Sequence, residues 1–350
     1  MKKKYLGMVS IVILCLNISC IETNKKKGVI YFTRADCRDS VNVVLDTIPI
    51  SHDIFNPIAF HVIKDSLLLV RNAQNSDFLV EVYNLNTKQL LTKAARRGKG
   101  FNEVLGGFTV YSSEQSYFLF FDMISRRFQK YDIDSLIAYK EHYLPILQNT
   151  PREAVDIALI DSNRFVFYDD RYLESKKFSN GLPELGIEYL NPATKYSAKD
   201  FKYFAGSING GKIYNKPDHS KIAVFSLYDD KINIYDHQLV LQKTIKGPDN
   251  YLPEFITQQN QWGTVVVKGK NLMPAYGLGF ATNDYIYTVY LGYKDFKKYT
   301  EIFKLDWDGK LIKRYIVQYH IDVLSISNGY IYGTASEEPR SMPKLVRFKI

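Results

Sequence analysis

A basic, glycine-containing stretch, KAARRGKGFNEV at residues 93–104, is the first candidate for binding chemistry in this chain. Glycine-rich loops with a lysine can hold phosphate groups, but such loops normally lead into a helix N-terminus, and no helical pattern follows here. The stretch therefore predicts a connection between two strands. Two interpretations remain, a structural turn or a turn that faces a ligand. In the second, the contact residues are Arg97, Lys99, Asn102 and Glu103.

The charge balance argues against nucleic acid as a partner. The formal net charge is +9, but residues 1–19 hold three lysines and no acid. Without them, 43 Lys and Arg stand against 37 Asp and Glu, a net charge of +6. These charges are spread along the chain and form no basic stripe or known nucleic-acid-binding module. We therefore expect no nucleic-acid partner.

Other short motifs predict no cofactor and no metal. GSINGGKI at residues 206–213 resembles a phosphate-binding loop, but it lacks the final Ser or Thr that would bind Mg²⁺. DWDG at residues 306–309 continues directly into a strand, which favours a hairpin turn over a calcium loop. The six histidines form no H-E-x-x-H motif or close pair with metal-ligand spacing.

The N-terminus has the pattern of an export signal. Lys2, Lys3 and Lys4 precede an apolar run, LGMVSIVILCLNI, which is too short to span a bilayer. The run ends at LNISC, which resembles a bacterial lipobox with Cys20 as the lipidated residue, although Asn17 stands where Leu is usual. Acyl chains on Cys20 would hold the protein on a membrane without a transmembrane helix. An ordinary secretory signal with a chance cysteine is the alternative.

After export and acylation, Cys37 remains the single free thiol, so no intramolecular disulfide is expected. The predicted organisation has a signal peptide at residues 1–19, a lipidated tether at residues 20–39 and one domain at residues 40–350. The sequence IETNKKK after Cys20 is basic, and it lacks the acidic run that often marks surface export. We therefore expect an outer-membrane lipoprotein of the cell envelope that faces the periplasm.

A repeated pattern of short apolar runs and polar turns predicts an all-β fold, a six-bladed β-propeller. The third strand of each copy carries a marker residue, and neighbouring markers are 43–70 residues apart: Tyr83, Tyr131, Tyr189, Tyr235, Leu305 and Phe348. The longest gap contains a predicted insertion at residues 247–274, and the second longest a predicted loop at residues 174–186. The last copy lacks one strand. Residues 40–50, SVNVVLDTIPI, are expected to complete it and close the ring.

Several phrases resemble the TolB-like six-bladed propeller lipoproteins of Bacteroides-type bacteria over residues 40–350. They are RRGKGFNEVL, IKGPDNYLP, LDWDGKLIKRYIV and the C-terminal GYIYGTAS with KLVRFKI. The family commonly has Gly-Arg-Gly-Pro-x-Glu at the first place. Here Lys99 follows Gly98 and Phe101 replaces the proline, while Gly100 and Glu103 are kept. The resemblance implies a lipid-anchored, exported propeller, and it implies no catalytic residues.

The predicted function is a monomeric binding module that presents one propeller face to an envelope protein, peptide or glycan. Besides the turn residues, the insertion supplies the contact candidates Tyr251 and Trp262. The alternative is a metal-dependent hydrolase or lyase with its site in the central channel. His61 and Asp156, in strands expected to line that channel, are the residues to inspect for it, although each alone is more often structural. No G-x-S-x-G nucleophile elbow is present.

Overall fold

The computed structural model describes most of the chain from Gly28 onward. The described residues are 28–50, 57–72, 77–111, 116–140, 144–145, 154, 156–161, 163–168, 172–177, 183–188, 203–204, 211–251, 253–261, 263–292, 299–337, 341 and 343–350. Residues 1–27, with the predicted signal and Cys20, lie outside this set. No helix among the described residues is long and apolar enough to cross a membrane.

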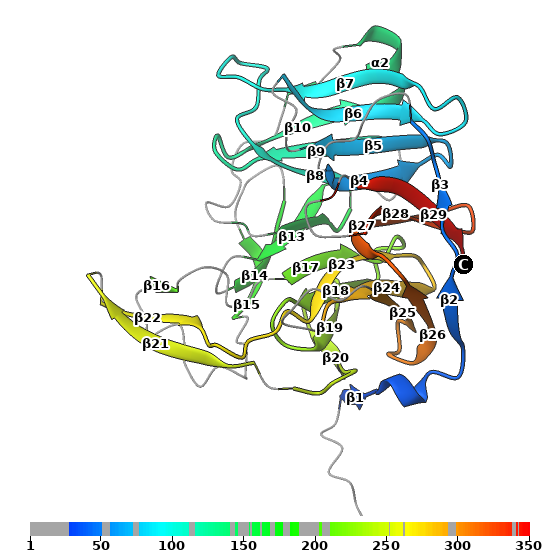
Figure 1. The fold of residues 1–350 in the computed structure, drawn as a ribbon. Helices are drawn as coiled ribbons and strands as arrows, with labels where there is room; N and C mark the ends of the chain where they lie inside the picture. Colours follow the sequence, from blue (N-terminus) through cyan, green and yellow to red (C-terminus); the bar gives the residue numbers. More distant parts are fainter. Residues whose placement is uncertain are drawn as a thin grey trace, which may run out of the picture.

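Six antiparallel sheets follow one another in the described part of the chain, and each is a propeller blade (Figure 1). Blade one has β4 (Pro57–Ile63), β5 (Leu67–Asn72), β6 (Phe78–Asn84) and β7 (Leu90–Arg96). Blade two has β8 (Gly107–Tyr111), β9 (Tyr117–Asp122), β10 (Arg127–Asp132) and β11 (Leu144–Pro145). Blade three has β12 (Asp156–Leu159), β13 (Arg164–Tyr168), β14 (Tyr172–Lys177) and β15 (Pro183–Glu188).

The second half of the ring repeats this arrangement. Blade four has β17 (Gly211–Asn215), β18 (Lys221–Ser226), β19 (Lys231–Asp236) and β20 (Leu241–Lys246). Blade five has β23 (Tyr276–Ala281), β24 (Tyr285–Tyr290), β25 (Thr300–Asp306) and β26 (Leu311–Val317). Blade six has β27 (His320–Ser327), β28 (Tyr330–Ser336) and β29 (Lys344–Lys349), with an N-terminal strand at its outer edge.

The ring closes as predicted, but with a shorter strand. β3 (Asp46–Thr47) pairs antiparallel with β29 and completes the last blade. The preceding strand, β2 (Ser40–Val43), instead pairs parallel with β26 and adds a fifth strand to blade five. The N-terminal segment thus covers exposed sheet edges, whose unpaired N–H and C=O groups would otherwise remain open.

The second half of the predicted tether, residues 29–39, contains regular structure that packs along the blades. β1 (Val29–Tyr31) pairs parallel with β20 at the outer edge of blade four, and the 3₁₀ turn η1 (Arg34–Asp36) follows it. In Figure 1, β1, β2 and β3 run along the outside of three successive blades, and β3 lies beside β29. The apolar run VIYF at residues 29–32 contains this strand, but it lies before the repeated blade pattern and was therefore assigned to the tether.

Blade three differs most from the sequence prediction. β14 and β15 pair with each other over the residues where a loop was expected, and Tyr189, the predicted third-strand marker, lies outside the described residues. The sequence YLESKK lacks the apolar alternation that predicts a strand, and PELGIE has only two aliphatic residues besides its proline and its glycine. A short helix, α2 (Ile133–Tyr139), was also missed. Its N-cap is Asp132, whose side chain accepts a hydrogen bond from the N–H of Ser135 at 2.8 Å.

The predicted insertion between blades four and five forms a hairpin of β21 (Phe255–Asn260) and β22 (Gly263–Lys268). A two-residue strand, β16 (Tyr203–Phe204), pairs parallel with β22. Figure 1 shows this three-stranded sheet extending away from the six blades.

The hydrophobic core lies between neighbouring blades. The other five marker residues, Tyr83, Tyr131, Tyr235, Leu305 and Phe348, are all at most 4 % exposed. Between blades one and two, the rings of Phe118 and Tyr131 stack 5.0 Å apart within a cluster that also contains Leu69 and Val80. Each central strand is buried on both faces by this stacking. The sequence of a central strand is therefore a continuous apolar run, such as LLLV in β5.

Candidate functional site

The basic stretch found in the sequence forms a closed turn between β7 and β8. Arg97 and Val104 form a parallel β-bridge. The N–H of Gly98 donates to the carbonyl oxygen of Val104 at 3.0 Å, and the N–H of Val104 donates to that of Arg96 at 2.8 Å. These bonds hold both ends of the turn together without a ligand.

Glu103 is part of the framework of this turn. Its carboxylate accepts a hydrogen bond from the N–H of Gly100 at 2.8 Å and lies 3.7 Å from the guanidinium of Arg96. A Cβ atom at Gly98 would stand 1.9 Å from a carboxylate oxygen of Glu103, so the glycine leaves the space that this carboxylate occupies. The carboxylate of Glu103, a predicted ligand contact, therefore stabilises the turn.

A patch of exposed cationic and apolar side chains surrounds the turn. Phe101 is 79 % exposed, and the next loop on this face, between β9 and β10, exposes Met123 and Ile124. Arg127 joins the two loops, because its guanidinium donates to the carbonyl oxygens of Phe101, at 2.9 Å, and Glu103. We call this surface the basic rim: Arg96, Arg97, Lys99, Phe101, Asn102, Met123, Ile124 and Arg126.

Strand directions place the basic rim and the N-terminus on opposite faces of the ring. The rim follows the C-terminal end of β7, the outer strand of blade one. β20 is the equivalent outer strand of blade four, and β1 runs parallel to it. Gly28 therefore lies at the face opposite the rim. We call the two the rim face and the tether face.

The candidates of the insertion do not join the rim. Tyr251 is half-buried at the junction of blades four and five, and its O–H donates to the carbonyl oxygen of Met273 at 2.6 Å. Burial, together with the nearby carboxylates of Asp230, Asp229 and Asp249, raises its pKa above the usual range. Trp262 lies outside the described residues. Blades one and four are opposite in a six-membered ring, so Tyr251 and the turn residues form no common site.

The junction of blades four and five instead holds a charged network that the sequence did not reveal. Arg34 donates to both carboxylate oxygens of Glu301, at 2.8–3.0 Å, and also to Asp249. Arg314 contacts Glu301 from the other side, with Nε at 2.7 Å. Since Glu301 is 3 % exposed, both guanidinium groups are needed to compensate its buried charge. This network fastens the N-terminal segment to two blades.

The second candidate site is the central channel, a cavity of about 600 Å³ lined by the inner strands of all six blades. Its wall includes residues of the turns that end inner strands, such as Asp65, Asn283 and Asn328, so the cavity lies toward the tether face. Volumes of 300–1,000 Å³ are typical of small-molecule sites. No single stretch of sequence predicts it, because each strand contributes a few residues.

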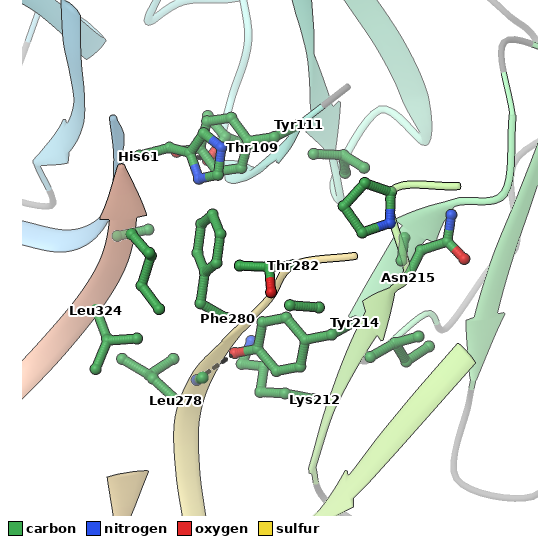
Figure 2. Close-up of a pocket in the computed structure, with 18 of the residues that line it drawn as sticks. His61, Thr109, Tyr111, Lys212, Tyr214, Asn215, Leu278, Phe280, Thr282 and Leu324 are labelled. Carbon is green, nitrogen blue, oxygen red and sulfur yellow. Dashed lines mark hydrogen bonds between the residues drawn. The ribbon is translucent and has the colours of Figure 1, made fainter. Parts of the chain in front are cut away.

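His61 faces this channel, as the sequence suggested, within a stack of three rings. Its imidazole lies 4.2 Å from the ring of Tyr111 and 5.1 Å from that of Phe280, nearly parallel to both. Burial lowers the pKa of His61 to about 4, so the imidazole is neutral near pH 7. Figure 2 shows the three rings gathered on one part of the wall, with Tyr214 and Lys212 on another.

Asp156 also lines the channel, but its carboxylate is engaged. One oxygen accepts from the N–H of Ile213 at 2.7 Å, and the other lies 3.2 Å from Nζ of Lys212. In the described part of the chain, no three His, Cys, Asp or Glu side chains converge as metal ligands would. The arrangement of His61 and Asp156 therefore gives no support to the metal-dependent hydrolase or lyase considered above.

Two solved structures are similar to this chain. The fold is similar to the crystal structure of RRP9 WD40 repeats, with a TM-score of 0.50 and 9 % identity, over 87 % of this chain and 99 % of that chain. A member of the DUF4221 family from Bacteroides vulgatus matches with a TM-score of 0.49 and 12 % identity, over 88 % and 98 % of the two chains. At such low identity, the similarity to RRP9 concerns the fold alone.

The sequence matches no curated protein at a significant level. It does match the family model described as TolB-like 6-blade propeller-like, over residues 43–329. This range begins in the N-terminal segment just before the closing strand and extends into blade six, and it includes both candidate sites. The repeat pattern, the ring of six sheets and the family match lead to one assignment: this chain belongs to the TolB-like six-bladed propeller family.

Proposed function

We propose that the protein is an exported, lipid-anchored binding module whose rim face contacts an envelope protein, peptide or glycan. Cys20 is the proposed lipid attachment site, on an outer-membrane lipoprotein that faces the periplasm. The module acts as a monomer and without catalysis. The observation that carries the proposal is the basic rim, a rigid turn that exposes cations and an aromatic side chain.

The rim is preorganised, which favours binding. Its backbone is held by the bridge between Arg97 and Val104, by the carboxylate of Glu103 and by the guanidinium of Arg127. A surface that is already ordered loses little conformational entropy when a partner binds. Phe101, 79 % exposed beside cations, has the character of an aromatic anchor at a protein interface.

Charge favours an acidic partner. The side chains of Arg97 and Lys99 have no hydrogen-bond or ion-pair partner among the described residues, and both are exposed. Two carboxylates close to the turn are committed elsewhere. Glu103 belongs to the turn, and buried Asp122 accepts from the N–H of Leu105 at 3.0 Å and the hydroxyl of Ser125 at 2.6 Å. The two cations therefore remain available to acidic groups of a partner.

The position of the proposed anchor also supports the rim face as the contact surface. At most about 28 Å of extended chain would separate a lipidated Cys20 from Gly28. Because Gly28 lies at the tether face, this anchor would hold that face toward the membrane and turn the rim face toward the aqueous compartment. A partner at the rim is then a molecule of the periplasm or of the inner membrane that bounds it on the other side.

The test is chemical cross-linking of the full-length protein in intact cells, followed by identification of the captured partner. Wild type is compared with Arg97→Ala/Lys99→Ala, and with the matched control Lys88→Ala/Lys310→Ala. The control removes two exposed lysines of the tether face and leaves the same net charge. We expect the rim variant to lose about 90 % of the captured partner and the control to keep it. Equal capture by all three proteins would refute the rim as the contact surface.

A further inference from the structure

We infer that the central channel binds a second, chemically different ligand, an uncharged saccharide with one or two rings. The inference goes beyond the proposed function, because the cavity lies toward the tether face and shares no residue with the basic rim. It rests on three features of the wall: its aromatic surface, its unused hydrogen-bonding groups and its balanced charge.

The aromatic surface is the stack of His61, Tyr111 and Phe280. Aromatic side chains between the blades, such as Phe118 and Phe121, are at most 1 % exposed. The three stacked rings, by contrast, are only half-buried, and all three line the cavity. They come from the inner strands β4, β8 and β23, so three different blades build this surface (Figure 2). Flat, partly exposed rings of this kind suit the apolar C–H face of a sugar ring.

Two hydroxyl hydrogens of the wall remain available to a ligand. The oxygen of Tyr214 accepts from the N–H of Gly279 at 2.7 Å, and the hydrogen of this phenol has no acceptor among the described residues. The hydroxyls of Thr109 and Tyr111 share one hydrogen bond at 2.8 Å, so one of their two hydrogens also remains to be donated. Burial raises the pKa of Tyr111 to about 12, and burial with the charge of Asp156 raises that of Tyr214, so both stay protonated.

His61 adds a donor and an acceptor on the same wall. Its neutral imidazole carries one N–H and one free nitrogen lone pair, and neither has a partner in the described part of the chain. The channel therefore offers three donors and one acceptor around an aromatic surface. A set of this kind matches hydroxyl groups, which donate and accept in turn.

The charges inside the channel favour a ligand without charge. Nζ of Lys212 lies 3.2 Å from a carboxylate oxygen of Asp156, so these two charges balance. Asp65, whose carboxylate accepts from the hydroxyl of Ser327 at 2.5 Å, is exposed, and solvent screens its charge. Arg71 is not part of the cavity lining, and burial lowers its pKa. A charged ligand inside the channel would lose hydration without finding an unpaired buried charge of opposite sign.

The test is isothermal titration of the full-length protein. The probes are neutral mono- and disaccharides of glucose, galactose, mannose and N-acetylglucosamine in both anomeric linkages, with digalacturonate and choline as charged probes. We expect at least one neutral saccharide to bind with a Kd between about 10 μM and 1 mM, and neither charged probe to bind. No binding by any neutral saccharide, or stronger binding of a charged probe, would overturn the inference.

Two phenol variants then localise the site. Tyr214→Phe and Tyr111→Phe should each weaken saccharide binding about tenfold, since each removes one hydrogen-bond donor. Tyr235→Phe is the matched control: it lies in the same blade as Tyr214, and its oxygen also accepts one hydrogen bond, from Asn233 at 3.3 Å, but it is not part of the channel wall. An equal loss in the control would mean that the effect is structural and would refute the site.

A further variant separates this inference from the proposed function. Arg97→Ala/Lys99→Ala should bind the saccharide with unchanged affinity, because its two substitutions lie on the opposite face. If it loses the envelope partner and keeps the saccharide, the two sites are independent. A parallel loss of saccharide binding would contradict the assignment of that ligand to the channel.

Discussion

Two connections between blades occupy equivalent places in the repeat, and they use charge in opposite ways. The connection from blade one to blade two is short, and it points Arg97 and Lys99 into solvent while Glu103 closes the turn from inside. The connection from blade four to blade five begins at Gly247 and leads past Asp249, which binds Arg34 in a network centred on the buried carboxylate of Glu301. Arg97 and Lys99 of the first connection are therefore free to bind a partner, whereas Asp249 of the second connection holds the N-terminal segment through Arg34.

The same contrast applies to the acidic residues near each connection. Asp122, beside the first, is fully buried but accepts hydrogen bonds from the N–H groups of Leu105 and Ile124. Asp230, beside the second, is equally buried, yet one of its oxygens has no hydrogen-bond partner in the described part of the chain. Desolvation, the largest effect, raises the pKa of Asp230 to about 7. Burial of a carboxylate is thus compensated at one junction and only partly at the other.

The largest expected change in unfolding free energy comes from breaking the charged network between blades four and five. Glu301→Ala removes the carboxylate that lies between Arg34 and Arg314, and it leaves two guanidinium groups without their partner. Removing one member of a buried ion pair typically costs about 3 kcal/mol of unfolding free energy. We expect such a loss in urea unfolding. Asp308→Ala, which breaks exposed pairs with Lys243 and Lys221, should change stability by less than about 1 kcal/mol.

The substitution Asp230→Asn should have a smaller effect, and it should raise the unfolding free energy. The pKa of this carboxyl is about 7 in the folded protein and near 3.8 in the unfolded chain. The folded state therefore loses stability as pH rises from about 4 to 7, where the buried group must ionise. The variant has no charge to bury, so we expect it to be more stable than wild type by about 2 kcal/mol at pH 8. The difference should shrink toward pH 4; a difference that is constant with pH would refute the ionisation of Asp230 as its cause.

At the first junction, Gly98→Ala tests whether Glu103 holds the turn. The added methyl group would displace the carboxylate and remove its hydrogen bond to Gly100, at a cost of about 1 kcal/mol in urea unfolding. Glu103→Ala should cost a similar amount. The double variant should then cost no more than either single change, because both remove the same interaction. Additive losses would show that Gly98 and Glu103 act separately.

The smallest effect on stability is expected for Arg97→Ala/Lys99→Ala. Both side chains are exposed and have no partner among the described residues, so thermal unfolding should stay within about 0.5 kcal/mol of wild type. Capture of the envelope partner should nevertheless fall strongly. A loss of unfolding free energy well above about 0.5 kcal/mol would mean that these two cations stabilise the fold. The contrast between the two junctions would then not hold.

Much of the architecture follows from the sequence, because a blade is made by neighbouring segments. Alternating apolar runs and polar turns predicted most strands of the blades other than blade three, with Tyr83 and Leu305 buried in third strands as expected. The prediction failed where that signal is weak. The strand β14 carries four polar residues in a row, β15 contains a proline and a glycine, and α2 is only two turns long. The apolar run VIYF contains β1, but its pairing with β20 joins segments far apart in the sequence, which a local pattern does not specify.

The sequence by itself determined the class of fold, the ring closure by an N-terminal strand and the exposed position of Arg97 and Lys99 in a connection. Only the tertiary structure decided which side chains meet. His61, Tyr111 and Phe280 are far apart along the chain, and only the closed ring brings their rings within about 5 Å. The same holds for Arg34 and Glu301. Local patterns record which segments form strands, whereas the contacts that build a site between blades arise from packing over long distances in sequence.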